Sequence, residues 1–479
     1  MNETTISAEA LLRYPAVDEA RLDALLAREL AASRTKLVVL DDDPTGVQTV
    51  HGVSVYTDWS VESVRQGFAE ATRLFFLLTN SRSFTAEQTV KAHREIAENV
   101  CRVSRETGTP FLLLSRSDST LRGHYPLETE TLRDTIRACG GGEIDGEVLC
   151  PFFKEGGRYT LNNVHYVRAG DTLVPAGETE FAGDKTFGYR ASELREYVEE
   201  KTGGAVRADD VTGISLDELR AADVDGITAK LCAVRDYGRV VVNAVDYCDV
   251  KAFAVALYRA VAAGKRFLFR TAAGLVKVLG GVPDRPLLTR ADMVKRETPH
   301  GGLVIAGSHT KKTTEQLNAL LTLPDVEAVE FRSDAVLDGD DALLAAAAEA
   351  SKRCEAIIRA GKTAVCYTSR RLLSVENDTP EDALRRSVKI SEGVCAVVTG
   401  LGVTPAFVVA KGGITSSDVG TKALGVRRAL VLGQIRPGVP VWETGAESRF
   451  PNTPYVIFPG NVGEVETLKE AVEVLTKTP

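Results

Sequence analysis

The sequence lacks the features that mark membrane, zinc-binding and nucleic-acid-binding proteins. It has no run of about 18 apolar residues, so it predicts no membrane span. Its eight cysteines include no Cys-x-x-Cys pair, which argues against a zinc site. Acidic residues (66) outnumber basic ones (58), and the net charge of −8 argues against a broad basic face for nucleic acid or anionic membranes. A local basic pocket for a small anion is compatible with this balance.

The N-terminus has neither a basic start nor an apolar core, so it does not predict a secretory signal peptide. We therefore expect a cytoplasmic protein with reduced cysteines. The length of 479 residues, with 44% hydrophobic and 26% charged residues, is typical of a globular chain with two or three domains.

Short apolar segments alternate with helical patterns along most of the chain. Residues 37–40, 74–78 and 111–115 are predicted strands, and each leads into polar residues and then towards a helix. The same alternation resumes after residue 302. This pattern predicts an α/β protein with two domains, each a largely parallel sheet covered by helices.

The predicted domain boundaries follow changes in composition. Residues 1–35 are expected to form an N-terminal helical extension, and residues 36–280 the first domain. Residues 281–301 contain prolines, glycines and charges without a period, which is typical of a linker. Residues 302–479 are then the second domain.

The most informative stretch is the end of the first predicted strand, where Asp41, Asp42 and Asp43 follow an apolar run and precede a Pro-Thr-Gly turn. The carboxyl ends of parallel strands are where α/β proteins bind ligands. Carboxylates there accept hydrogen bonds from hydroxyls, hold a cation or take a proton. Three adjacent acids repel one another, and a plain turn needs one at most. We therefore favour a functional role over an acidic turn without one.

Polar side chains follow all three predicted strands of the first domain. Arginine binds carboxylates through two parallel hydrogen bonds, whereas carboxylates bind hydroxyls. The set therefore matches a ligand with both groups, a small sugar acid. The alternative is that the arginines form surface ion pairs and that the hydroxyl residues only cap helices. The clusters are Asp41, Asp42, Asp43 and Thr45; Asn80, Ser81 and Arg82; and Arg116, Asp118, Ser119 and Arg122.

Three glycine turns in the second half lie between a predicted strand and a helix. Backbone N–H groups at a helix start attract anions, and a missing side chain allows close approach. Each turn alone could be a tight connection, but three in one predicted domain favour a phosphate cradle. The sequence has no Walker A motif and no dinucleotide fingerprint after the first strand. The turns are Gly307-Ser308, Lys411-Gly412-Gly413-Ile414-Thr415 and Gly460-Asn461-Val462-Gly463.

Taken in order, the motifs resemble the four-carbon acid sugar kinase family. They are DDDPTG, TNSR, SRSDSTLRG, GSHTKKTTEQ, KGGITSSDVG and PGNVG, and the similarity covers almost the whole chain from about residue 36. The resemblance implies a substrate-binding N-terminal domain and an ATP-binding C-terminal domain, with the active site in the cleft between them. It also implies ATP-dependent phosphorylation of the terminal hydroxyl of threonate, erythronate or a 3-oxo-tetronate, with Mg²⁺ as the metal.

The resemblance assigns roles by position. It implies that Asp42, Asp43, Arg82, Asp118 and Arg122 face the sugar acid. On the nucleotide side it implies Ser308, Gly412, Gly413, Thr415, Gly460 and Gly463, to which the third turn adds Asn461. Our catalytic candidates are Asp43 and Asp118, one of which would accept the hydroxyl proton. The substrate-binding candidates are Asp42, Thr45, Asn80, Arg82, Arg116, Ser119 and Arg122, and no metal ligand is assigned.

The chain departs from the family pattern at two positions where the family often has a lysine. Arg116 stands where the family usually has a lysine, and Phe458 stands where a lysine often precedes the last glycine turn. Phe458 is the support for an alternative function, a sensor that binds sugar acid and nucleotide without catalysis. A further alternative is a metal-assisted aldolase or dehydratase that uses the acidic cluster without ATP. The sequence leaves the oligomeric state open, a homo-oligomer included.

Overall fold

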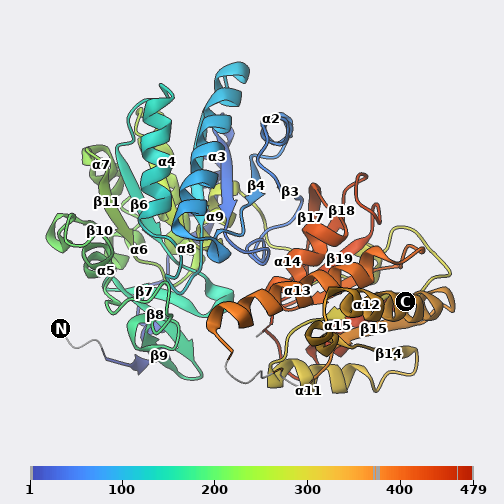
Figure 1. Cartoon of the computed structure of the whole chain (residues 1–479). Helices are drawn as coiled ribbons and strands as arrows, with labels where there is room; N and C mark the ends of the chain where they lie inside the picture. The colour runs from blue at the N-terminus through green and yellow to red at the C-terminus, as the bar shows by residue number, and fades with distance from the viewer. Residues whose placement is uncertain (1–3, 371–372, 374–377, 461, 477–479) are drawn as a thin grey trace. The chain divides into compact units, whose positions relative to one another are not determined.

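The computed structural model describes all residues except 1–3, 371–372, 374–377, 461 and 477–479 (Figure 1). The chain divides into two compact units. Unit 1 is Met1–Thr49 with Asp58–Pro283, and unit 2 is Val50–Thr57 with Asp284–Pro479. The short segment 50–57 therefore belongs to unit 2, although it lies in the range from which we expected the first domain to form.

The main sheet of unit 1 is parallel throughout. Its strands β2 and β4 are buried along their whole length, as expected of apolar runs in a sheet covered on both faces. In sheet order the strands are β10 (Thr212–Ile214), β11 (Gly238–Val242), β6 (Gly146–Cys150), β12 (Phe267–Thr271), β5 (Phe111–Arg116), β2 (Lys36–Asp41) and β4 (Leu74–Leu78).

Helices cover both faces of this sheet (Figure 1). Helices α3 and α4 pack against each other, whereas α8 packs against α1, α7 and α9. Right-handed crossovers place α3 and α4 on one face and α8 on the other. The helices of unit 1 are α1 (Glu19–Ala32), α2 (Val61–Ala69), α3 (Ala86–Thr107), α4 (Leu127–Ala138), α5 (Leu194–Lys201), α6 (Leu216–Arg220), α7 (Val224–Ala233), α8 (Tyr247–Ala262) and α9 (Ala273–Gly280). Single turns are η1 (Ala8–Leu12), η2 (Ser81–Ser83), η3 (Lys154–Gly156), η4 (Ala176–Glu178) and η5 (Ala208–Asp210).

Helix ends follow local capping chemistry. Helix α3 starts with a capping box between Thr85 and Gln88, and Gly108 follows its last residue with a φ of 64°. Asp246 caps α8, so the helix begins at Tyr247. The preceding strand β11 ends at Val242.

Unit 1 also has a small antiparallel sheet that periodicity did not reveal. Its strands, in sheet order, are β1 (Ile6–Ser7), β9 (Thr172–Pro175), β8 (Val164–Ala169) and β7 (Arg158–Leu161). Asn162 and Asn163 join β7 to β8 with φ values of 50° and 66°. Two residues with positive φ form the tight hairpin turn that matches the strand twist, and asparagine tolerates it.

Unit 2 contains a parallel core of five strands extended by antiparallel ones. In sheet order they are β3 (Val53–Tyr56), β17 (Arg428–Arg436), β18 (Val439–Thr444), β19 (Pro454–Phe458), β16 (Val408–Lys411), β13 (Leu303–Ala306), β15 (Thr363–Thr368) and β14 (Val326–Phe331). Helices α11 and α15 pack together, and so do α12 and α13. The helices and turns are α10 (Arg290–Met293), α11 (Lys311–Leu320), η6 (Ser333–Asp338), α12 (Asp340–Arg359), α13 (Pro380–Thr399), α14 (Gly413–Asp418), η7 (Val419–Ala423) and α15 (Thr467–Thr476).

The predicted fold class is confirmed: the protein is α/β, with two domains built on largely parallel sheets covered by helices. In the described part of the chain, no helix is long and apolar enough to cross a membrane.

Strand β3 belongs to unit 2 but is far from the rest of that unit in the sequence, and this predicts an effect on the thermal stability of unit 2. Val53 to Tyr56 pair antiparallel with Val431 to Arg428, so a fragment of residues 284–479 leaves this edge of β17 open. Open sheet edges promote association. We expect the fragment to melt at least about 4 °C lower, and to associate more, than the same fragment with residues 50–57 fused through a flexible linker. Calorimetry and light scattering measure both. A fusion with Val53→Asp and Val55→Asp is the matched control, and equal behaviour of all three proteins would contradict the prediction.

Candidate functional site

The carboxyl ends of β4, β2 and β5 bring the predicted polar clusters of unit 1 together. These strands are neighbours, and their register pairs Asp41 with both Leu78 and Arg116. The residues that follow each strand therefore leave the sheet at the same level. Side chains far apart in the sequence meet at this edge, where parallel sheets bind ligands.

Arg82 is the cation at the centre of this cluster. Its Nη2 lies 2.7 Å from Asp42 Oδ1 and its Nε 3.2 Å from Asp42 Oδ2, a two-bond pair. Its Nη1 lies 3.6 Å from Asp43 Oδ2 and 3.9 Å from Asp118 Oδ1. Burial disfavours the charge, but the three carboxylates hold the pKa of Arg82 well above its usual value. Arg82 therefore neutralises acids of the protein itself.

Asp118 is held by both a cation and the backbone of its own loop. Arg122 Nε donates to Asp118 Oδ2 at 2.8 Å, and the Thr120 hydroxyl donates to the same oxygen. The Asp118 N–H donates to Asp42 Oδ2 at 3.2 Å. Burial alone would raise the pKa of Asp118, but Arg82 and Arg122 lower it far below its usual value. This carboxylate is therefore ionised at every physiological pH.

Asp41, the last residue of β2, is buried, and Arg116 Nη1 donates to its Oδ1 at 3.1 Å. Burial raises the pKa of Asp41 to about 7, even though Arg116 opposes this shift. Gly46 closes over it: a Cβ at residue 46 would lie 1.9 Å from Asp41 Oδ1. Arg116, predicted to bind substrate, is buried and also lies 3.6 Å from Asp42 Oδ1. Its geometry suits a positioning role, and substrate binding by Arg116 stays a prediction.

The other predicted residues of unit 1 lie at the same edge. The Thr45 N–H donates to Asp43 Oδ1 at 2.8 Å, and the Thr45 hydroxyl donates to the same oxygen. Asn80 is half-buried with a φ of 54°, and its N–H lies 3.4 Å from the Asp41 carbonyl oxygen. Ser119 is buried, and its carbonyl accepts a hydrogen bond within the fold.

Three side chains that the sequence analysis left unassigned hold the loop 118–123. His165 Nε2 donates to the Ser119 carbonyl at 2.8 Å, the Tyr189 hydroxyl to the Thr120 carbonyl at 2.7 Å, and the Tyr197 hydroxyl to the Leu121 carbonyl at 2.8 Å. Burial lowers the pKa of His165 to about 4, so the ring is neutral. Leu121 has a φ of 68°, a conformation that costs a non-glycine residue energy and persists only when surrounding contacts enforce it.

Three further residues beside the cluster were missed because they come from β7 and an irregular loop. Arg158 and Arg122 both lie over the ring of Phe181, with guanidinium carbons 5.7 Å and 5.1 Å from its centroid. Asp184 Oδ2 lies 3.9 Å from Arg122 Nη1. The one indication in the sequence was that the segments carrying them mix charged, glycine and aromatic residues without a helical or strand period.

In unit 2 the three predicted glycine turns meet at one sheet edge. Strands β13, β16 and β19 are parallel neighbours, and their register aligns Ala306, Lys411 and Phe458. A Cβ at Gly307 would lie 2.3 Å from Thr415 Oγ1, and one at Gly412 would lie 3.4 Å from the Ser308 Cβ. A Cβ at Gly460 would lie 3.9 Å from the Gly412 Cα. The turns therefore approach one another so closely that only glycine fits at Gly307.

Gly413 and Gly463 have different surroundings. No described atom lies within 4 Å of a Cβ placed on Gly413, at the start of α14, so this backbone is open to a ligand. The first N–H groups of a helix have no partner within the helix, and an anion can accept their hydrogen bonds. Gly463 has a φ of 81°, and a Cβ there would lie 2.7 Å from the Thr467 Cβ. Asn461 lies outside the described residues.

Lys411 and Arg370 brace these turns. Lys411 is buried, and its Nζ donates to the carbonyl oxygens of Pro459 at 2.6 Å and Gly460 at 3.0 Å. Burial lowers the pKa of Lys411 to about 7, and Lys312 adds to the shift. Arg370 Nη1 donates to the Ser308 carbonyl at 2.6 Å. The sequence analysis noted Lys411 beside the second turn but assigned neither cation to the site.

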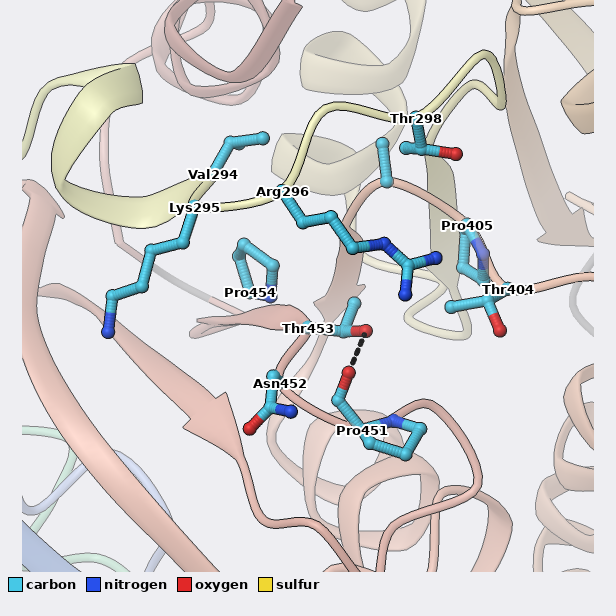
Figure 2. Close-up of a pocket in the computed structure, with 11 residues that line it drawn as sticks. Val294, Lys295, Arg296, Thr298, Thr404, Pro405, Pro451, Asn452, Thr453 and Pro454 are labelled. Atoms are coloured by element: carbon cyan, nitrogen blue, oxygen red, sulfur yellow. Dashed lines mark hydrogen bonds between the residues drawn. The ribbon is translucent and has the colours of Figure 1, made fainter.

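A cavity of about 180 Å³ in unit 2 lies at the opposite ends of the same strands (Figure 2). Thr298, Ala406 and Pro454, at or before the first residues of β13, β16 and β19, help to line it. Figure 2 shows the Arg296 side chain lying between the segments that carry Pro454 and Pro405. None of the predicted site residues lines this cavity, so it is separate from the glycine turns.

No group of three or more His, Cys, Asp or Glu side chains in the described part of the chain is arranged to hold a metal ion.

Comparison with known proteins agrees with this two-part organisation. Residues 37–279 match the family model of a sugar-binding N-terminal domain, and residues 303–468 match that of a nucleotide-binding C-terminal domain. The chain thus combines a sugar-binding and a nucleotide-binding domain. It belongs to the four-carbon acid sugar kinase family, as the motifs indicated.

Solved structures share the fold at low sequence identity. A protein from Salmonella typhimurium LT2, provisionally named a tRNA synthase, matches with a TM-score of 0.65 and 15% identity over 91% of this chain and 98% of its own. Haemophilus influenzae protein HI1011 matches with a TM-score of 0.59 and 18% identity over 91% of this chain and 100% of its own. No curated protein matches the chain.

The close approach of Gly46 to Asp41 predicts a steric effect. In Gly46→Ala the new methyl group would displace the Asp41 carboxylate from Arg116, and we expect a loss of about 1–3 kcal/mol in the free energy of unfolding. Urea unfolding measures this change. Gly183→Ala is the control, because its Cβ would only meet the Glu180 carbonyl oxygen at 3.5 Å. Equal stability of the two variants would show that the Asp41 carboxylate is not confined.

The pKa of Lys411 predicts a pH dependence. A lysine whose pKa falls to about 7 on folding binds fewer protons in the folded than in the unfolded state between pH 7 and its ordinary pKa. The free energy of unfolding should therefore rise with pH above 7, by up to about 1.4 kcal/mol per pH unit from this residue. Urea unfolding from pH 6.5 to 9 should show a steeper rise for the wild type than for Lys411→Met. Identical slopes would overturn the assignment.

Proposed function

We propose that the protein is an ATP-dependent kinase that phosphorylates the terminal hydroxyl of a small, four-carbon sugar acid such as threonate, erythronate or a 3-oxo-tetronate. The observation that carries this proposal is the cluster of Asp42, Asp43 and Asp118 with Arg82 and Arg122 at the ligand-binding edge of the sugar-binding domain. The nucleotide-binding domain in the same chain would bind ATP, the second substrate of such a reaction.

Asp43 is the better candidate for the general base. Its side chain is 21% exposed, compared with 12% for Asp118. Thr45 occupies Asp43 Oδ1 with two hydrogen bonds, which orients the carboxylate. Its Oδ2 lies 3.6 Å from Arg82 Nη1 and would accept the hydrogen bond of a substrate hydroxyl. Asp118 has a strongly lowered pKa, which makes it a weak proton acceptor. In this mechanism Asp43 takes the hydroxyl proton, and Asp42 and Asp118 accept hydrogen bonds from other hydroxyls.

The glycine turns of unit 2 serve as the phosphate cradle. ATP would supply the phosphoryl group, and Mg²⁺ would help to offset the charge of its phosphates. Backbone N–H groups at Ser308 and Gly413 and the Thr415 hydroxyl would bind phosphate oxygens, because these turns adjoin one another and Gly413 is open. Lys411 holds the third turn in place through the Pro459 and Gly460 carbonyls. Such transfer depends on positioning and charge stabilisation more than on covalent chemistry.

The test is an ADP-release assay with ATP, Mg²⁺ and a panel of threonates, erythronates, 3-oxo-tetronates and branched analogues. We expect release above the no-acid background with at least one acid. With that acid, Asp43→Asn should lower kcat by about 10²- to 10⁴-fold, because proton transfer is lost, while the exposed Asp209→Asn control should keep wild-type kcat.

Two outcomes would point to other functions. Binding of acid and ATP, seen as raised melting temperatures, without any ADP release would favour the sensor. Turnover of an acid without ATP would favour the aldolase or dehydratase. Full activity of Asp43→Asn would remove Asp43 as the base and leave the kinase function intact.

A further inference from the structure

Arg158, the first residue of β7, differs in its partners from the other arginines at the unit 1 cluster. Arg82 lies within 4 Å of three carboxylates and Arg116 of two. Arg122 pairs with Asp118 at 2.8 Å. Among the residues that the structure describes, no carboxylate forms an ion pair with Arg158, and its Nη1 donates only to the Gly156 carbonyl oxygen.

The Nε of Arg158 is buried and has no hydrogen-bond partner in the described part of the chain. A buried donor without a partner destabilises a folded protein, and more so when it is charged. Such a group in a folded protein calls for an explanation, and a ligand that is absent from the protein alone is one. The protein thus keeps a costly donor beside its acidic cluster.

The ring of Phe181 lies against the guanidinium groups of both Arg158 and Arg122. The guanidinium carbons of Arg158 and Arg122 lie 5.7 Å and 5.1 Å from the centroid of its ring. The ring attracts both cations and gives them an apolar surface to pack on. Two arginines are therefore held near each other against their mutual repulsion. Burial is the main cause that lowers the pKa of Arg158, and Arg122 adds to it, whereas the charges of Asp118, Glu180 and Tyr189 raise it. An added anion would relieve this imbalance.

We propose that Arg158, together with Arg122, binds the carboxylate of the sugar acid, and that Arg82 instead holds the protein's own aspartates in place. The inference rests on the proposed function, and it names the group by which the site selects acids over neutral polyols. A carboxylate has two oxygens that match the two-donor edge of a guanidinium. Bound there, it would accept the hydrogen bond that Nε of Arg158 lacks and would neutralise the excess positive charge over Phe181.

The test compares an acid with its uncharged counterpart in the full-length protein. For the acid that gives ADP release, Arg158→Met should raise KM at least about 30-fold, since a charged hydrogen-bonded pair is worth about 2–3 kcal/mol. The matching polyol, threitol or erythritol, should be phosphorylated equally poorly by both proteins. Arg158→Lys should recover part of the loss, because an ammonium keeps the charge but not the two-donor edge. Arg168→Met, on the neighbouring strand β8 with an exposed side chain, is the matched control and should keep the wild-type KM.

Stability separates a binding role from a structural one. Because Arg158 brings an unsatisfied donor and an unpaired charge, Arg158→Met should leave the melting temperature of the ligand-free protein unchanged or raise it. Stabilisation by a saturating acid should be lost in this variant, while stabilisation by ATP should be retained. A lowered melting temperature together with wild-type KM for the acid would overturn the inference and leave the kinase proposal standing. A wild type that neither binds any acid nor releases ADP would overturn both.

Discussion

The pair of Arg82 with Asp42 is the interaction on which the unit 1 site depends. Three consecutive aspartates at a strand end repel one another, and two arginines from the neighbouring strand ends compensate them: Arg82 follows β4, and Arg116 ends β5. Removing one partner of a buried ion pair costs about 3–5 kcal/mol, because the other charge is left uncompensated. The site is thus stable only while β4, β2 and β5 stay in register. Arg82 is engaged by three carboxylates of the protein itself, which is why we propose a different arginine for the carboxylate of the ligand.

Much of this edge was predictable from sequence, because each part of it is local. A buried parallel strand appears as an apolar run, and its polar end follows directly, so residues 37–43, 74–82 and 111–122 could be read without knowing their neighbours. The same logic located the glycine turns at Gly307 and Gly412. It located neither β7 nor Phe181, because short antiparallel strands and irregular loops have no long period. For the same reason a four-residue strand such as β3 does not reveal which unit its partner belongs to. The positions of the residues in the cluster were predictable, but the carboxylates with which each arginine pairs were not.

Arg116 illustrates what residue type alone leaves open. A guanidinium binds carboxylates through two bonds, but the sequence does not say whether those carboxylates belong to a ligand or to the protein. In the structure the carboxylates that it meets are Asp41, at 3.1 Å, and Asp42, at 3.6 Å, and the side chain is buried. Arg116 therefore pairs with the buried acids of the protein, among them Asp41, whose pKa burial raises to about 7. These contacts show how Arg116 holds the acids, and its binding of substrate stays a prediction.

Phe458 raises the same question in unit 2, and the answer comes from the neighbouring strand. Read along β19 alone, a phenylalanine in place of lysine means that a cation is missing before the last glycine turn. The register of the sheet sets Lys411 of β16 directly beside Phe458, and Lys411 Nζ lies 4.5 Å from the ring centroid. The Lys411 amine donates to the carbonyls of Pro459 and Gly460, where that turn begins. Burial lowers its pKa to about 7, so the amine is charged below that pH and largely neutral above it. A basic group therefore stands at the turn although β19 does not carry it, and Phe458, the only support for a non-catalytic sensor, does not by itself leave the turn without one.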